Sequence, residues 1–101
     1  MRDRRRSGGM TREAAEQIAA RALLFLAEDA GRLGRFLAET GLDPRALRGR
    51  MREPEILVAV TGYLMADESA LLAFAANARL QPEEIARAEA ALGGGSPWES
   101  T

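Results

Sequence analysis

The sequence predicts an all-α fold, a compact bundle of about six helices built from two similar three-helix units. The composition favours helix, because alanine is the commonest residue, with 20 copies, and residues that branch at Cβ are few. The chain also repeats a pattern of apolar residues, Asp and Pro after 38 residues. A spacing of this kind is typical of a duplicated helical unit, and we expect the two copies to form a pseudo-two-fold repeat.

The repeat is clearest around two Asp and two Pro residues. Asp29 aligns with Asp67, and Pro44 aligns with Pro82. The apolar pairs at the same spacing are Ile18 with Ile56, Phe25 with Tyr63, Leu26 with Leu64, Leu33 with Leu71, Phe36 with Phe74, Leu42 with Leu80 and Leu47 with Ile85. Each unit therefore consists of a long helix, a helix capped by Asp and a helix opened by Pro.

Apolar periodicity and helix-boundary residues together predict six helices. The expected spans are residues 12–28, 30–40, 44 to about 50, 54–66, 68–78 and 82 to about 92. The N-cap residues, whose side-chain oxygens can accept from the free N–H groups of a first turn, are Thr11, Asp29, Asp43 and Asp67. The helix at 54–66 is apolar on almost every side, which indicates a buried central helix. We expect it to pack against the helix at 12–28 and so to join the units.

The length of 101 residues predicts one domain with one modest core. We expect the helical domain at residues 11–93, with units at about 11–51 and 53–92. Residues 1–10 are expected to form a disordered Arg-rich tail, and residues 94–101 a flexible C-terminal tail. Either Met1 or Met10 could be the native start.

The residues that are absent exclude several kinds of chemistry. The chain contains no Cys, no His and no Lys, which excludes thiolate and Schiff-base nucleophiles and the commonest metal ligand. Pairs of acids, such as Glu83 and Glu84, lie at helix starts or junctions, where carboxylates interact with free N–H groups. We therefore expect no enzyme, no cofactor and no metal. The longest apolar run, residues 56–66, is too short to span a membrane, and we expect a cytoplasmic protein.

A basic segment offers one candidate contact surface, for a protein partner or for nucleic acid. Its residues are Arg45, Arg48, Arg50 and Arg52. Residues 37–50 can be aligned with a helix-turn-helix motif, with Gly41 in the turn and the arginines on the second helix. However, the second unit has acids where the first has Arg45 and Ala46, and a net charge of −1 gives little attraction to phosphate. Nucleic-acid binding is therefore the alternative function and not the favoured one.

A second candidate surface is apolar. Four apolar residues lie off the main core stripes: Leu24, Val58, Met65 and Leu72. Exposed together they would form a patch for a protein partner or a second copy, and covered by neighbouring helices they would be core. Residues 1–52 carry a charge of +5 and residues 53–101 carry −6, which would also suit a homodimer between the arginines at 45–52 and the acids at 83, 84 and 89. We expect a small helical interaction or structural module.

Three segments of the chain resemble a known family. They are MTREAAEQIAARALLFLAED from Met10, LGRFLAETGLDP from Leu33 and YLMADESALLAFAANARLQPEEI from Tyr63. With these segments, residues 11–94 resemble an uncharacterised alphaproteobacterial family of small helical proteins, catalogued as a domain of unknown function. No activity, cofactor or catalytic residue is assigned to that family, so the resemblance implies a helical fold and nothing about chemistry.

Overall fold

The structure is a computed structural model that describes residues 10–93. The predicted all-α fold is confirmed, since these residues contain six helices and no strand. The helices are α1 Arg12–Ala27, α2 Ala30–Thr40, α3 Pro44–Arg48, α4 Pro54–Ala66, α5 Glu68–Ala78 and α6 Pro82–Ala91. The tails predicted at residues 1–10 and 94–101 lie outside the described residues, apart from Met10, which packs against the core.

The helix starts agree with the residues that were expected to cap them. Thr11 Oγ1 accepts a hydrogen bond from the Ala14 N–H at 3.0 Å, and Asp29 Oδ1 accepts one from the Gly31 N–H at 2.9 Å. Asp43 and Asp67 accept in the same way at the starts of α3 and α5. Each such cap typically stabilises a helix by about 1 kcal/mol. The four caps therefore fix where each helix begins and which of its faces points inward.

The third helix is shorter than the sequence predicted. The expected helix reached residue 49, 50 or 51, whereas α3 ends at Arg48 after five residues, with Gly49 as its C-cap. Leu47 is the only residue of α3 that is fully buried. Glycine disfavours the helical conformation, and a helix with one buried side chain gains little packing energy to offset that cost. Helix α3 therefore does not continue past Gly49.

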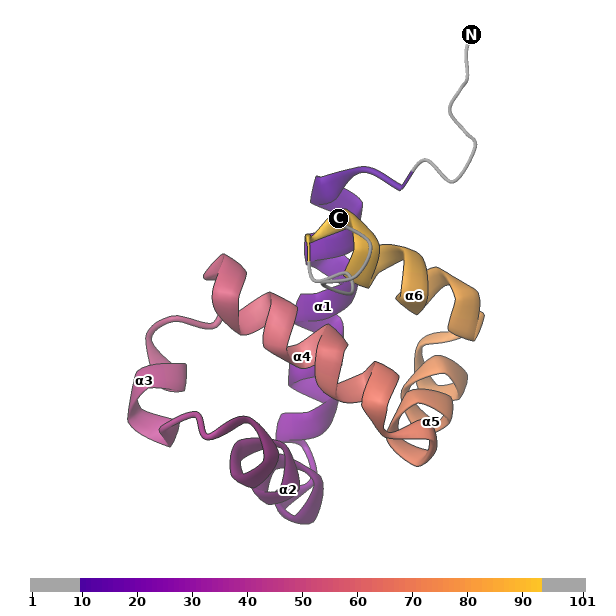
Figure 1. The fold of residues 1–101 in the computed structure, drawn as a ribbon. Helices are drawn as coiled ribbons and strands as arrows, with labels where there is room; N and C mark the ends of the chain where they lie inside the picture. Colours follow the sequence, from indigo (N-terminus) through magenta and orange to yellow (C-terminus); the bar gives the residue numbers. More distant parts are fainter. Residues whose placement is uncertain (1–9, 94–101) are drawn as a thin grey trace, which may run out of the picture.

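Two long helices, α1 and α4, cross at the centre of the bundle (Figure 1). The contact between them that the sequence predicted is present, and α6 packs against both. The buried residues of α1 include Ala15, Ala19 and Ala22, and those of α6 include Ala88. Because a methyl group occupies little space, these helices can approach closely. Helix α3 lies at the edge of the bundle.

Two aromatic pairs join the N-terminal half to the C-terminal half. Phe25 of α1 contacts Phe74 of α5, with ring centroids 5.6 Å apart. Phe36 of α2 contacts Tyr63 of α4 edge to face, with centroids 5.4 Å apart. Such pairs typically contribute about 0.5–1.5 kcal/mol beyond the area they bury. Both pairs therefore connect the core across the two halves of the chain.

The helices are short relative to the thickness of a bilayer. None of the helices within residues 10–93 is by itself long and apolar enough to cross a membrane. Helices α4 and α5 have the length and composition only when taken together, and the chain bends by 110° between them.

Candidate interaction surface

The basic segment lies on α3 and on the turn that leads to α4. One of its arginines, Arg50, forms ion pairs with Glu53 and Glu55, each with a closest nitrogen–oxygen distance of 2.7 Å. The hydrogen bond with Glu53 is the main reason why the pKa of Arg50 is raised and the pKa of Glu53 is lowered. The guanidinium of Arg50 is therefore already occupied by two carboxylates of its own chain.

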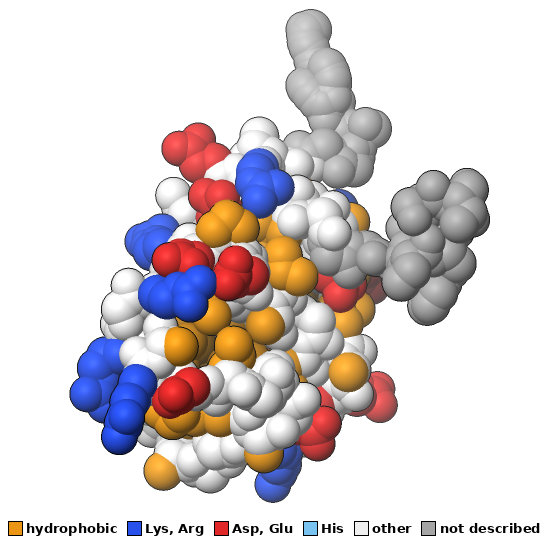
Figure 2. Space-filling view, turned by 60° about the vertical axis from the view of Figure 1, so that its left-hand side comes forward, with side chains coloured by type: hydrophobic (Ala, Val, Ile, Leu, Met, Phe, Trp, Pro, Cys, Tyr) orange, Lys and Arg blue, Asp and Glu red, His pale blue; other side chains and the backbone are white. Residues whose placement is uncertain are grey.

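The other three arginines of the segment are exposed. Arg45, Arg48 and Arg52 make no ion pair within residues 10–93. Arg45 and Arg48 stand on a helix of five residues, less than two turns, which offers a short rod for insertion into a DNA groove. Figure 2 shows the face on the α3 side of the molecule, where apolar side chains occupy the middle and charged side chains surround them.

The four apolar candidates differ in their exposure. The exposed fraction is 55% for Leu24, 49% for Leu72 and 37% for Met65. Val58 is half-buried and packs against the core. Leu24 belongs to α1, Met65 to α4 and Leu72 to α5, and Leu24 lines two hollows. Leu24 therefore has a shaped surface around it.

Leu24 stands between two hollows on the outer side of α1. The first has a volume of about 220 Å³ and is lined by Ala20, Leu23, Leu24, Met51 and Arg52. The second has a volume of about 160 Å³ and is lined by Arg21, Leu24, Phe25, Glu28, Phe74, Asn77 and Ala78. We call the residues that line the two hollows the Leu24 surface. Two helices pack when side chains that project from one enter the grooves of the other. Leu24, with a hollow on each side, has the shape that such packing requires.

Sequence reasoning missed two charged residues of the Leu24 surface. Arg21 lies on α1 and Glu28, seven residues later, is the C-cap of that helix, and both are exposed. Arg21 donates a hydrogen bond from Nη2 to the Ala78 carbonyl oxygen at 3.1 Å, which holds its side chain across α5. Exposed residues at 21, 24 and 28 follow the spacing of one helix face, and this spacing was a signal in the sequence that could have found them.

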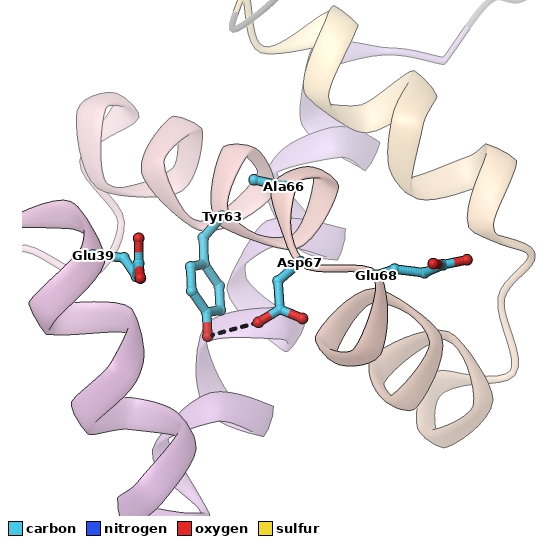
Figure 3. A pocket seen from close by; sticks show the side chains of 5 residues that line it. All are labelled: Glu39, Tyr63, Ala66, Asp67 and Glu68. Carbon is cyan, nitrogen blue, oxygen red and sulfur yellow. Dashed lines mark hydrogen bonds between the residues drawn. The ribbon is translucent and has the colours of Figure 1, made fainter.

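A third hollow, of about 270 Å³, lies between α2 and the junction of α4 with α5. It is lined by Glu39, Tyr63, Ala66, Asp67 and Glu68 (Figure 3). The Tyr63 hydroxyl donates to Asp67 Oδ2 at 3.4 Å, and the Glu39 carboxylate lies on the other side of the ring. The Glu68 side chain points away from Tyr63. The Tyr63 ring therefore lies between the Glu39 and Asp67 carboxylates, and its hydroxyl is bonded to Asp67.

The chemistry of this third hollow follows from Tyr63. Burial, with a smaller contribution from the nearby Asp67 carboxylate, raises the pKa of the Tyr63 hydroxyl. The hydroxyl is therefore a proton donor held in place by the N-cap residue of α5. Within residues 10–93 no group of three or more Asp, Glu, His or Cys residues is arranged to hold a metal ion.

The family comparison covers most of the chain. Residues 12–95 match the model of the family described as "Protein of unknown function (DUF3572)". Neither a curated protein nor a solved structure matches the chain.

Proposed function

The chain belongs to this DUF3572 family of unknown function, and from its surface we propose that it is a small helical protein–protein interaction module without catalytic activity. The observation that carries the proposal is Leu24. It is 55% exposed on a helix whose other large apolar residues are buried or half-buried, and it stands between two hollows. The cytoplasmic location expected from the sequence stays a prediction.

The free energy of burying Leu24 would favour binding of a partner at this position. Burying a Leu side chain completely contributes about 1.5–3 kcal/mol, so covering the exposed part of Leu24 would contribute about 1 kcal/mol. The same contact would remove water from the half-buried apolar residues that line the first hollow, Ala20 and Met51. Charged residues at the rim, Arg21, Glu28 and Arg52, would set the orientation of the partner more than its affinity.

The proposal includes the two-unit architecture expected from the sequence, with units at about 11–51 and 53–92. Its support is the pattern of aromatic contacts. Phe25 aligns with Tyr63 and Phe36 aligns with Phe74 at the 38-residue spacing. The observed pairs are Phe25 with Phe74 and Phe36 with Tyr63, so each contact joins the first helix of one unit to the second helix of the other. Exchange of this kind is what a two-fold relation between the units produces.

The experiment places a photo-crosslinking amino acid at position 24 of the full chain, in cells that naturally make the protein. The matched control carries the same amino acid at position 72, because Leu72 is exposed to a similar degree on a different helix. We expect a crosslinked adduct of defined mass from position 24 and not from position 72. The substitution Leu24→Asp should abolish the complex in cell extracts without shifting the melting temperature by more than a few degrees. Equal crosslinking at both positions would contradict the proposal.

Nucleic-acid binding through the basic segment is the alternative function. The observation in its favour is that Arg45, Arg48 and Arg52 are exposed and free of ion pairs within residues 10–93. The five residues of α3 and the pairing of Arg50 with two glutamates count against it. Fluorescence anisotropy with a labelled random duplex at low salt tests it. Binding that weakens with salt and is lost in Arg45→Ala/Arg48→Ala would favour the alternative.

A further inference from the structure

We infer that the partner of the Leu24 surface is a second copy of the same chain. In this dimer the two α1 helices pack antiparallel, and the two-fold axis passes between residues 24 and 25. The inference rests on the proposed function, because it names the occupant of the same surface. Two properties of this surface carry it: the order of its charges and the shape beside Leu24.

The charges on α1 complement themselves about that axis. Arg21 and Glu28 are two helical turns apart and lie on the same line of the helix surface, with Leu24 and Phe25 between them. When two such helices run antiparallel about the midpoint, Arg21 of each copy faces Glu28 of the other. A parallel arrangement would instead place like charges opposite one another. The order of charges therefore selects the antiparallel arrangement.

Both of these charged side chains are available for such a contact. Neither Arg21 nor Glu28 forms an ion pair within residues 10–93. Arg21 uses one N–H group on the Ala78 carbonyl oxygen, and a guanidinium has five N–H donors. The hydrogen bond therefore positions Arg21 and leaves donors for the carboxylate of a second copy.

The shape beside Leu24 suits the same arrangement. The second hollow has a volume of about 160 Å³, and its lining includes the paired rings of Phe25 and Phe74. An engineered cavity of about 150 Å³ holds one benzene molecule, so this hollow has room for one Leu side chain. Under the two-fold axis, Leu24 of each copy enters the hollow of the other, and both exposed leucines are covered at once.

A homodimer between the basic segment and the acids of α6 is the competing arrangement. Some of the charges that it needs are already used. Arg50 binds Glu53 and Glu55, and Glu84 Oε1 accepts from the Gln81 N–H at 2.7 Å.

The first experiment is sedimentation velocity of the full chain, from about 1 µM to about 1 mM, a range that covers weak and moderate affinities. We expect the mass to rise from the monomer value of 10.9 kDa to twice that value. Leu24→Asp should stay monomeric over the whole range, whereas Leu72→Asp should behave as the wild type. Circular dichroism checks that each variant is folded. A wild type that is monomeric throughout, or a dimer unaffected by Leu24→Asp, would overturn the inference.

The second experiment reverses the charges and does not depend on Leu24. Arg21→Glu and Glu28→Arg, each alone, place like charges opposite one another twice, and each should weaken the dimer at least about tenfold. An equimolar mixture of these two variants pairs opposite charges at both places, so dimers should reappear in the mixture. The double variant should also dimerise. If mixing restores nothing, the antiparallel arrangement is wrong.

The two proposals fail in different ways. A chain that is monomeric alone but crosslinks to a different protein at position 24 in cells would refute the homodimer and leave the interaction module standing. A chain that neither dimerises nor crosslinks at position 24 would refute both.

Discussion

Gly41 and Arg79, which lie 38 residues apart, both adopt the left-handed backbone conformation, with φ of 75° and 60°. Gly41 is the C-cap of α2, and Arg79 is the C-cap of α5. Glycine takes this conformation without steric cost, whereas a side chain at Cβ makes it cost about 1 kcal/mol. The two helices therefore end in the same left-handed turn, which Gly41 makes without steric cost and Arg79 makes at a cost.

The substitution Arg79→Gly should stabilise the protein by about 0.5–1 kcal/mol, because it relieves this conformational cost at an exposed position. Gly41→Ala should do the opposite and destabilise by about 1 kcal/mol, although a Cβ at Gly41 would touch nothing within 4 Å. Urea denaturation of both variants and the wild type measures the free energy of unfolding. A destabilised Arg79→Gly would show that the arginine side chain contributes more than its backbone costs.

A second prediction concerns Gly34 in the middle of α2. A Cβ at this position would meet no atom within 4 Å, and the residue is exposed. Gly34→Ala should therefore stabilise the protein by about 0.5–1 kcal/mol, the difference in helix propensity between the two residues. Gly31→Ala is the matched comparison on the same helix. Its Cβ would lie 3.3 Å from Asp29 Oδ1, the capping oxygen, so its gain should be smaller. Thermal unfolding followed by circular dichroism ranks the two variants.

Sequence reasoning predicted the features of this fold that depend on neighbouring residues. The Asp and Thr caps and the positions of α2, α4 and α5 depend on local chemistry, which a single sequence displays. The exposure of Leu24 depends on the angles at which the helices pack, which the sequence does not display. Its neighbour Leu23 is equally apolar and is buried. The first hollow could not be predicted from local sequence either, because Met51, which lines it, comes from a turn 27 positions after Leu24.

The left-handed Arg79 illustrates a second kind of limit. The sequence around Gly41 predicts a helix end because glycine favours positive φ, and the aligned position has no glycine. The chain still makes a Schellman-type turn there, in which the Leu80 N–H donates to the Ala75 carbonyl oxygen at 2.9 Å, and the Leu80 side chain packs against the core. Packing can thus override the preference of a single residue, and such cases are visible only in the fold.

A third prediction follows from the pair between Arg50 and Glu53. The pKa of Glu53 is lowered, first by its hydrogen bond with Arg50. Because the pKa is lowered in the folded state, the pair stabilises the fold at pH values above the ordinary pKa of Glu. This contribution is lost as pH falls through the lowered pKa. Both side chains are solvent-exposed, so the effect on stability should be small. Carbon-detected NMR titration should show the Glu53 midpoint rising in Arg50→Gln, and an unchanged midpoint would contradict the prediction.

The last prediction uses the fact that Tyr63 is the only tyrosine of the chain, so that ultraviolet absorbance reports its ionisation alone. Its pKa is raised, mainly by burial and secondly by the Asp67 carboxylate. The folded chain should therefore ionise above the ordinary value of about 10. In Asp67→Asn the midpoint should fall toward that value and stay above it, because burial, the larger cause, remains.

The same shift determines how stability depends on alkaline pH. Because the folded state holds the Tyr63 proton more tightly than the unfolded state, the stabilising contribution is complete below pH about 10 and decreases as pH rises through the folded-state pKa. Tyr63→Phe removes the proton while keeping the ring against Phe36. Its free energy of unfolding should therefore decrease less between pH 9 and 11 than that of the wild type, measured by urea denaturation at each pH. Parallel pH profiles for the two proteins would show that Tyr63 is not the group that titrates.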